Sequence, residues 1–482
     1  MTAYDQELRR RAYEEVEKKE HIADSDPHRQ HFHIMPPVGL LNDPNGVVYW
    51  KGVYHLFFQW QPFQTEHGAK FWGHYTTGDF VNWKREEIAL APSDWFDKNG
   101  CYSGSAVVKD DRLYLFYTGN VRDQDGNRET YQCLAVSDDG LTFEKKGVVA
   151  RLPEGYTAHF RDPKVWEHEG KWYMVIGAQT ENLKGQAVLF TSDNLTEWAF
   201  LGPITGAGLN GLNGLNGFGY MWECPDLFSL QGSEVLIVSP QGLEADGYHY
   251  QNVYQSGYFV GRLDYEKTGL MHAAFTEIDQ GFDFYAPQTL EDDQGRRILF
   301  AWMAVPDQDE KDHPTKDYHW IHCMTLPRQL TLSGEKLIQQ PLPELKAMRK
   351  NGQEVQINMY GSSGTLPVEN PERAEILIED INTESGFEID IRATATFSFQ
   401  KEEGLITLTR TSFDGTRTEA RHCRISNLHT VHMFIDASSV EVFINHGEEV
   451  FSARYFPFPG NDEVTARSNG KSEMKVGIWT LM

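Results

Sequence analysis

The chain has 482 residues, which is long for a single hydrophobic core and predicts two or three domains. Its 44 Lys and Arg against 70 Asp and Glu give a net charge of −26, and no long basic run interrupts the acidic excess, which argues against a nucleic-acid partner. Aromatic residues make up 13% of the chain, enough to fill a core and to offer flat faces to a sugar or a base in a cleft.

Residues 1–30 form a charged leader in which Glu alternates with Lys and Arg at helical neighbour spacing. This pattern predicts an amphipathic helix from about residue 4 to 22. The leader contains no apolar run long enough for a signal peptide or a membrane span. We therefore expect a cytoplasmic protein without a membrane partner.

Strand-like runs rich in aromatic and β-branched residues recur along the first two thirds of the chain, bounded by Gly, Asp and Asn. Five of them share a marker, the second apolar residue of the run, and successive markers are 60, 59, 63 and 63 residues apart. The markers are Tyr54, Tyr114, Tyr173, Leu236 and Leu299.

A fixed period carried by units of short antiparallel strands is typical of radial repetition. Residues 31–342 are therefore predicted to form a five-bladed β-propeller. The alternative at this level is a large irregular β-sandwich with strands that are regularly spaced by accident.

The pattern changes after about residue 342. Residues 343–355 read as a helical linker, and residues 356–482 contain alternating polar and apolar runs that predict an antiparallel β-sandwich. The sandwich lacks aromatic clusters, so we expect it to support the propeller rather than react. The Leu-Asn-Gly triplets at 209–217 are predicted to form a loop, because glycine permits left-handed backbone.

The five cysteines are widely spread and include no CxxC pair, so they are predicted to be reduced core residues rather than disulfide or zinc ligands. The one compact cluster of metal-ligand types is "HWIHC" at 319–323, which has too few ligands for a convincing site. We expect no metal and no cofactor.

Polar residues stand at one register point before the markers. Asp43, Ser103 and Asp162 each precede their marker by 11 residues, as does Gln288, and Glu223 precedes its marker by 13. If each marker strand is the second of its blade, the strand before it lines the central axis. These side chains would then converge on one funnel.

The three acids lie in the motifs "NDPNG", "RDPKVW" and "WECPDLF", each of which holds an acid beside a proline. Asp-Pro and Asn-Gly pairs are also ordinary turn formers, and any one motif alone would favour the turn. Three acids in matched register with aromatic neighbours favour a reactive site. Phosphate-binding glycine motifs are absent, whereas paired carboxylates with an aromatic platform suit glycoside hydrolysis.

Local surroundings suggest how the acids divide the work. Glu223 lies between Trp222 and Cys224, and this apolar setting predicts a raised pKa and a protonated acid. Asp43 lies among turn N–H groups, which favour an ionised carboxylate. Asp162 follows Arg161 and would be a third, fixed anion that binds sugar hydroxyls.

At these residues the sequence resembles glycoside hydrolase family 32, the β-fructofuranosidases, and within it the bacterial sucrose-6-phosphate hydrolases. The resemblance runs from about residue 30 to the end. Its motifs, in chain order, are "LLNDPNG", "FFQWQP", "YSGSA", "FRDPKVW", "WECPDLF", "FYAPQT" and "SSVEVFINHGEEVFSARYFP".

The resemblance implies a propeller followed by a sandwich, and a retaining double displacement. Asp43 would be the nucleophile, Glu223 the acid/base and Asp162 the transition-state stabiliser. It also implies a fructose pocket lined by Asn42, Gln59, Tyr102, Ser103, Arg161, Tyr285 and Trp302. The expected substrate-binding set further includes Leu40, Leu41, Trp60, His67 and Trp72.

One position departs from the family pattern. Many relatives have tryptophan where this chain has His67, and Trp60 or Trp72 would have to replace the missing aromatic wall.

The substrate is a small sugar, and the choice between sucrose 6-phosphate and sucrose stays open at this level, as does the oligomeric state. A phosphate would need a local basic patch, for which the candidates are Lys70, His67, Arg122 and Arg128. Two alternatives share the motifs or the aromatics: a fructosyltransferase that passes the same intermediate to another sugar, and a non-catalytic sugar-binding propeller.

Overall fold

The computed structural model describes residues 2–208 and 217–482. The predicted loop of Leu-Asn-Gly triplets lies almost entirely outside these residues. Within the described ranges the chain is mostly β, with five sheets in its first two thirds and two in its last third.

The four main strands of each of the first five sheets are antiparallel and follow chain order. The first contains β1 (Gly39–Trp50), β2 (Val53–Gln61), β3 (Phe71–Thr77) and β4 (Trp83–Arg85). The second contains β5 (Cys101–Lys109), β6 (Arg112–Arg122), β7 (Arg128–Ser137) and β8 (Glu144–Arg151). The third contains β9 (Tyr156–His168), β10 (Lys171–Thr180), β11 (Gly185–Ser192) and β12 (Ala199–Gly206).

The fourth sheet contains β13 (Met221–Leu230), β14 (Ser233–Gln241), β15 (Gly257–Asp264), β16 (Gly269–His272) and the short β17 (Thr276–Glu277), which pairs with β15. The fifth contains β18 (Tyr285–Glu291), β19 (Arg297–Trp302), β21 (Arg328–Ser333) and β22 (Lys336–Pro341). The connection from β19 to β21 includes the short 3-10 helices η1 (Glu310–Asp312) and η2 (Pro314–Tyr318) and strand β20 (Trp320–Ile321).

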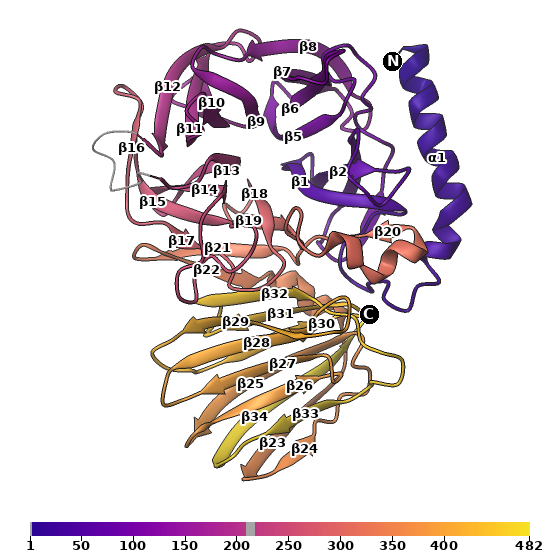
Figure 1. Ribbon diagram of the computed structural model, residues 1–482, viewed down its shortest axis with the longest axis vertical. Helices are drawn as coiled ribbons and strands as arrows, with labels where there is room; N and C mark the ends of the chain where they lie inside the picture. The colour runs from indigo at the N-terminus through magenta and orange to yellow at the C-terminus, as the bar shows by residue number, and fades with distance from the viewer. Residues whose placement is uncertain (1, 209–216) are drawn as a thin grey trace.

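The first strands of the five sheets form a closed ring. β1 contacts β5, β5 contacts β9, β9 contacts β13, β13 contacts β18, and β18 contacts β1. β20 adds a parallel pairing with β1, which ties the end of the ring to its beginning. Figure 1 shows the five sheets around this common centre. The predicted five-bladed propeller is confirmed, and all five marker residues lie in the second strand of their blade.

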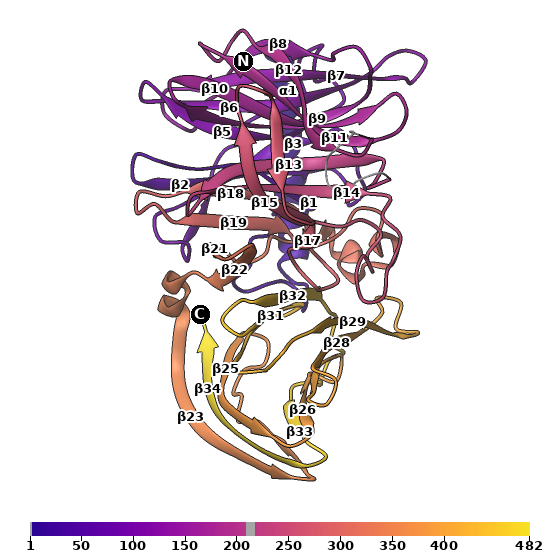
Figure 2. The same ribbon diagram turned by 90° about the vertical axis from the view of Figure 1, so that its left-hand side faces the viewer.

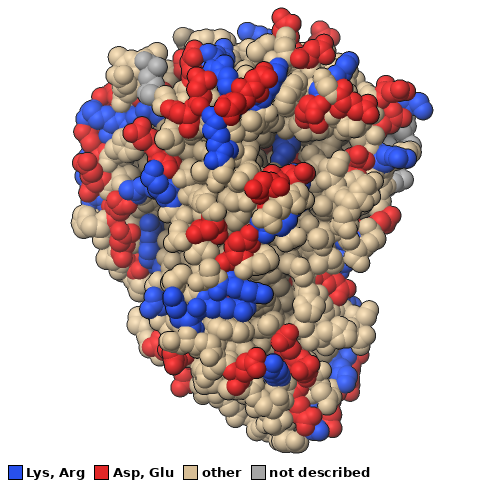
Figure 3. Space-filling model, turned by 180° about the vertical axis from the view of Figure 1, so that it is seen from behind, with Lys and Arg blue, Asp and Glu red and all other residues tan. Residues whose placement is uncertain are grey.

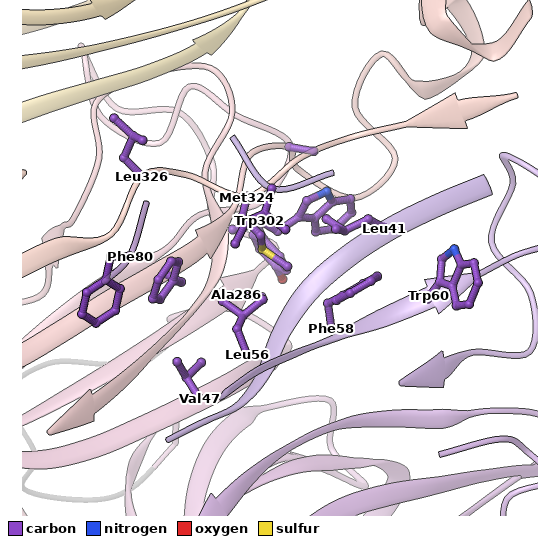
Figure 4. Close-up of a cluster of buried hydrophobic side chains, with 14 of the residues drawn as sticks. Leu41, Val47, Leu56, Phe58, Trp60, Phe80, Ala286, Trp302, Met324 and Leu326 are labelled. Carbon is purple, nitrogen blue, oxygen red and sulfur yellow. The ribbon is translucent and has the colours of Figure 1, made fainter. Parts of the chain in front are cut away.

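The first and fifth blades share a core. Figure 4 shows Leu41 and Phe58 from the first blade packed with Ala286 and Trp302 from the fifth, all of them buried. Truncating a buried aromatic of this kind costs about 3–5 kcal/mol, because the cavity it leaves cannot collapse. This core holds the two ends of the ring together.

The predicted N-terminal helix is confirmed as α1 (Ala3–Ala23), which lies along the outer edge of the propeller in Figure 1. The Thr2 side chain caps it by accepting a hydrogen bond from the backbone N–H of Asp5 (3.1 Å). Leu8, Ala12 and Val16 recur every four residues and are buried, so this stripe packs against the propeller. None of the described helices is long and apolar enough to cross a membrane.

The last third of the chain is a sandwich of two antiparallel sheets (Figure 2). One sheet contains β23 (Arg349–Tyr360), β34 (Lys471–Leu481), β25 (Ala374–Thr383), β30 (Val431–Ile435), β31 (Ser439–Ile444) and β32 (Glu449–Arg454). The other contains β24 (Ser363–Thr365), β33 (Val464–Arg467), β26 (Gly386–Ile391), β27 (Ala395–Gln400), β28 (Leu405–Thr411) and β29 (Thr418–Arg424). The 3-10 helix η3 (Pro343–Met348) precedes it, and β23 already begins within the predicted linker.

Buried charges join the sandwich to the propeller. Arg328 on β21 donates to Glu441 on β31 and lies 3.0 Å from Asp279, and all three side chains are fully buried. Removing one partner of such a network leaves an unpaired buried charge and costs about 3–5 kcal/mol. On the outer surface acidic and basic side chains are interspersed over both parts, as the rear face in Figure 3 shows. Their isolated ion pairs contribute little.

Candidate active site

All five innermost strands are irregular at the same level of the propeller. The pairing register between each first strand and its neighbour shifts there, as a β-bulge does. The shifts lie between Leu41 and Pro44 in β1, Tyr102 and Gly104 in β5, Arg161 and Lys164 in β9, Glu223 and Asp226 in β13, and Tyr285 and Gln288 in β18. The bulges bring side chains from all five inner strands to one level of the propeller axis.

Prolines and left-handed backbone build three of the bulges. Asp162, Cys224 and Ala286 have φ values of 68°, 47° and 50°, and each precedes a proline. A proline has no N–H to lose from the ladder, so it fits a position where pairing is interrupted. Positive φ at these residues is sparsely populated and is typical of functional sites. The acid-proline motifs thus serve as bulges of the inner strands.

A cavity of about 200 Å³ opens at this level. Ten of the predicted site residues line it together with two of the predicted phosphate ligands, Lys70 and Arg128. The ten are Asn42, Asp43, Gln59, His67, Tyr102, Arg161, Asp162, Glu223, Tyr285 and Trp302.

Five other members of the predicted set do not line the cavity. Leu40, Leu41, Trp60 and Trp72 are buried, and Ser103 lies behind Asp43 as its hydrogen-bond donor. The indole of Trp60 donates to the Val38 carbonyl (2.8 Å) and that of Trp72 to the Tyr102 carbonyl (3.1 Å). These five residues support the wall of the cavity from behind.

Asp43 is held by three side-chain donors. Ser103 and Gln59 donate to its Oδ2, the latter at 3.0 Å, and Asn42 donates to its Oδ1 at 3.1 Å. Burial raises the pKa of Asp43 above its ordinary value, and these donors and the charge of Lys70 only partly oppose that rise. The predicted stabilisation by turn N–H groups is wrong, because the bulge turns the carboxylate away from its own backbone and toward the axis.

Asp162 shares a donor with Asp43. The backbone N–H of Cys224 donates to Asp162 Oδ2 (2.9 Å), and the Cys224 thiol lies 3.6 Å from that oxygen and 3.7 Å from Asp43 Oδ2. Burial and the nearby charges of Glu223 and Asp43 raise the pKa of Asp162 to about 7, although Arg161 opposes the rise. Burial therefore raises the pKa of two of the three acids, Asp43 and Asp162.

Glu223 has the most polar surroundings of the three. Arg161 donates to its Oε1 through two nitrogens, and Tyr285 (2.6 Å) and Gln241 (2.9 Å) donate to its Oε2. Burial favours the neutral acid, but the charge of Arg161 and the hydrogen bonds from Tyr285 and Arg161 outweigh it and lower the pKa of Glu223. The predicted raised pKa of Glu223 is wrong, because the Trp222 side chain is buried away from the carboxylate and Arg161 reaches it from the preceding blade.

His67 lies at the cavity beside other polar side chains. His67 Nε2 lies 3.0 Å from Glu310, and the ring of His67 meets Trp302 edge-on with centroids 6.1 Å apart. Trp302 therefore forms the aromatic wall beside His67.

Lys70 is a buried cation at the cavity. It is 3% exposed, its Nζ has no hydrogen-bond partner among the described residues, and burial lowers its pKa to about 7.

Gln241 and Cys224 are among the site residues that the sequence did not predict. Gln241 lines the cavity and stands five residues after its marker, as Gln59 does in the first blade, so the repeat itself carried the signal. Cys224 was assigned to the core, which is where its buried side chain lies, but it also bridges two carboxylates. Only the tertiary contact reveals that second property.

The sandwich reaches the site through Arg410. This buried arginine donates to Asp283 (2.6 Å) and to Asp309 (2.9 Å). Asp283 is two residues before Tyr285, which donates to Glu223, and Asp309 precedes Glu310, which holds His67. The sandwich thus fixes two segments that supply cavity residues.

All five cysteines are free and buried, and the described residues contain no group of three or more His, Cys, Asp or Glu side chains that could hold a metal. Below the acids, Lys164 Nζ bonds Asp226 (3.0 Å) and the Thr289 carbonyl (2.7 Å) in a buried layer. A larger cavity of about 580 Å³ is lined by residues further along the inner strands, such as Val47 and Phe228, and by none of the three acids. The carboxylate chemistry belongs to the smaller cavity.

Replacing Asp162 with Asn is expected to stabilise the fold above pH 7. The folded protein holds a proton at Asp162 up to about pH 7, whereas the unfolded chain releases it near pH 4, so this group costs stability increasingly as pH rises through that window. Asn keeps the acceptor for Cys224 and removes the buried charge. We expect a gain of about 1–2 kcal/mol at pH 8 and none at pH 4, measured by thermal unfolding.

Asp226→Asn is the matched control for this prediction. Asp226 is also buried next to a proline, but Lys164 neutralises it. This variant should lose about 3 kcal/mol at pH 8. A loss of stability in Asp162→Asn at pH 8 would contradict the charge penalty at Asp162.

The geometry suits nucleophilic substitution at the anomeric carbon of a sugar. Three buried carboxyl groups meet hydroxyl, amide and guanidinium donors beside the aromatic rings of Tyr102 and Trp302. Such a site can place one carboxylate against an anomeric carbon and another against the leaving oxygen. The fold and the site together define a glycoside hydrolase.

Residues 33–341 match the glycosyl hydrolases family 32 N-terminal domain, and residues 344–480 match the glycosyl hydrolases family 32 C-terminal domain. The chain therefore belongs to glycosyl hydrolase family 32, and the resemblance inferred from its motifs is confirmed.

The relatives to which this chain is similar include several sucrose-6-phosphate hydrolases. The chain is 86% identical over 482 residues to the sucrose-6-phosphate hydrolase of Bacillus subtilis (strain 168), covering all of both chains. It is 44% identical to that of Klebsiella pneumoniae over 90% of each chain. Similar solved structures include a Lactobacillus gasseri sucrose-6-phosphate hydrolase (30% identity, TM-score 0.87, 98% and 96% coverage) and a Bombyx mori β-fructofuranosidase mutant in complex with sucrose (33% identity, TM-score 0.85, 98% of both chains).

Proposed function

We propose that this enzyme hydrolyses sucrose 6-phosphate, and sucrose less efficiently, by a retaining double displacement. The observation that carries the proposal is the convergence of Asp43, Asp162 and Glu223 on one cavity in a family 32 chain that is 86% identical to a sucrose-6-phosphate hydrolase. The products are fructose and glucose 6-phosphate, or fructose and glucose.

In the first step Asp43 attacks the anomeric carbon of the fructosyl unit, and the bond from that carbon to the glucosyl oxygen breaks. Glu223 gives its proton to the leaving oxygen. Asp43 suits attack, because Ser103, Gln59 and Asn42 fix its orientation. In the second step Glu223 takes a proton from water, and the water oxygen attacks the same carbon and releases Asp43.

Glu223 must hold a proton when the glycosidic bond breaks. Arg161 lowers the pKa of Glu223, while burial raises those of Asp43 and Asp162. The three groups share one cavity and titrate together, so a bound sugar can redistribute a proton among them without exchange with solvent. Because its pKa is raised, Asp162 favours a proton or hydrogen-bond donors around its carboxyl group. The fructosyl hydroxyls supply such donors when Asp162 binds them.

We also propose that residues 31–342 form the catalytic unit, that residues 356–482 support it, and that the enzyme acts in the cytoplasm. The contacts of Arg410 with Asp283 and Asp309 favour this division of labour. The N-terminal helix favours the cytoplasmic location, because its buried face packs against the propeller and Arg9 donates to the Ala89 carbonyl (3.1 Å). Five free cysteines suit a reducing compartment.

Steady-state kinetics on sucrose 6-phosphate, sucrose, raffinose and inulin test the substrate. We expect kcat/KM to be highest for sucrose 6-phosphate, with equal amounts of the two product sugars, because the relatives share the whole chain. Growing oligofructosides at high sucrose would favour a fructosyltransferase. Intact sugar after long incubation with concentrated protein would favour a binding protein and remove the proposal.

A further inference from the structure

The cavity contains three cationic side chains that are used very differently. Arg161 is paired with Glu223, whereas Lys70 Nζ and the guanidinium of Arg128 make no hydrogen bond or salt bridge within the described part of the chain. The Arg128 guanidinium instead lies over the ring of Tyr102, 5.9 Å from its centroid. In a chain of net charge −26, an unpaired arginine at a cavity lined by acids calls for a partner from outside.

A second cation lies directly opposite Arg128. Arg122 ends β6, Arg128 begins β7, and the two residues are cross-strand partners at the mouth of the same hairpin. Like charges in directly opposite positions destabilise a hairpin. Among the described residues neither arginine forms an ion pair: Asp123 accepts from Asn127 (3.0 Å), Glu129 accepts from Tyr131 (2.6 Å), and Arg122 donates to the Gly126 carbonyl (3.0 Å). An anion between the two guanidinium groups would remove the repulsion.

The two unpaired cations of the cavity lie on different sides of it. The Cys101 N–H donates to the Lys70 carbonyl (2.8 Å), and Ser103, two residues further along the same strand, donates to Asp43. Arg128 lies two residues before Thr130, whose hydroxyl donates to the Phe160 carbonyl (2.8 Å), and the next residue, Arg161, is paired with Glu223. Lys70 is therefore on the side of the nucleophile, and Arg128 is on the side of the acid/base.

We propose that Arg128, assisted by Arg122, binds the phosphoryl group of the leaving glucosyl unit and sets the preference for sucrose 6-phosphate over sucrose. This inference rests on the proposed function. Glu223 protonates the leaving oxygen, so the glucosyl half lies on the side of Glu223 and Arg128, while the fructosyl half lies against Asp43 and Lys70. The planar guanidinium of Arg128, already stacked on Tyr102, is suited to bidentate contact with phosphate oxygens.

The test compares Arg128→Gln with the wild type on both substrates. We expect KM for sucrose 6-phosphate to rise about 10- to 100-fold, the loss of a charge-assisted hydrogen bond, and the ratio of kcat/KM for sucrose 6-phosphate to that for sucrose to fall by a similar factor. Product inhibition by glucose 6-phosphate should weaken in parallel, and inhibition by glucose should not. Thermal unfolding checks that the variant is folded.

Two further variants make the assignment specific. Arg151→Gln is the matched control, because Arg151 also lies over a tyrosine ring (Tyr131, 5.4 Å) but outside the cavity, and the substrate ratio should not change. Lys70→Met removes the cation on the nucleophile side and should lower kcat/KM for both substrates by a similar factor. A ratio that falls in Lys70→Met and not in Arg128→Gln would place the phosphate at Lys70 and overturn the assignment.

Other outcomes separate this inference from the function on which it rests. If Arg128→Gln lowers kcat/KM for both substrates equally, Arg128 acts through Tyr102 and the inference fails while the proposed function stands. If the wild type hydrolyses neither sugar, the proposed function itself fails.

Discussion

Replacing Asp43 with alanine is expected to lower kcat for sucrose by at least about 10⁴-fold without lowering the melting temperature. The change removes the atom that forms the fructosyl ester, and no other group can take its place at the anomeric carbon. Stability should not fall, because burial already disfavours the charged form of Asp43. Stopped assays of glucose release and thermal unfolding measure the two quantities.

Adding azide to Asp43→Ala tests whether Asp43 is the nucleophile. The small anion fits the space left by the carboxylate and attacks the anomeric carbon once, while Glu223 still protonates the leaving oxygen. The product should therefore be the α-fructosyl azide, of inverted configuration. Asp26→Asn is the control, since Asp26 also precedes a proline but bonds the Trp320 indole (2.8 Å) outside the cavity, and its kcat should not change. A β-configured azide from Asp43→Ala would exclude Asp43 as the nucleophile.

Replacing Glu223 with alanine is expected to lower kcat/KM for sucrose by about 10²- to 10⁴-fold, the range that general acid catalysis supplies. A substrate with a leaving group that needs no proton, such as β-fructosyl fluoride, should still form the fructosyl ester. Fluoride should then appear as a burst of one equivalent, because the second step lacks its base. Rapid-mixing measurements of fluoride release detect the burst.

The stereochemistry again assigns the role. In Glu223→Ala azide attacks the ester after Asp43 has attacked first, so two inversions give the β-fructosyl azide. The limb of the pH profile that reports the acid/base should disappear in the same variant. A variant that hydrolyses sucrose and the fluoride with equally reduced rates would show that Glu223 orients Arg161 and Tyr285 instead of transferring protons.

Much of the propeller could be predicted from sequence because its signals are local. The markers from Tyr54 to Leu299 repeat since each blade needs the same buried second strand, and all five occupy that strand. The order of Asp43, Asp162 and Glu223 along the chain follows from the same repeat. Their neighbouring prolines marked an interruption of the inner strands, although only the backbone conformation identified it as a bulge.

The electrostatics could not be read from neighbours in the chain. Trp222 and Cys224 flank Glu223 and suggested an apolar setting, but side chains alternate along a strand, and the carboxylate faces Arg161 from the preceding blade and Tyr285 from the next. The family resemblance likewise suggested Trp60 as a replacement for the aromatic wall at His67, whereas the Trp60 side chain lies behind the cavity wall.

The sequence by itself determined the all-β repeat, the two-part organisation, the family and the set of carboxylates, because hydrophobic period, register and motif are properties of consecutive residues. Only the tertiary structure decided which charges meet. Arg161 is paired with Glu223, whereas Lys70 and Arg128 form no side-chain hydrogen bond or ion pair with any described residue. These pairings join residues far apart in the chain, and in a low-dielectric cavity a few ångströms decide which carboxyl group holds the proton.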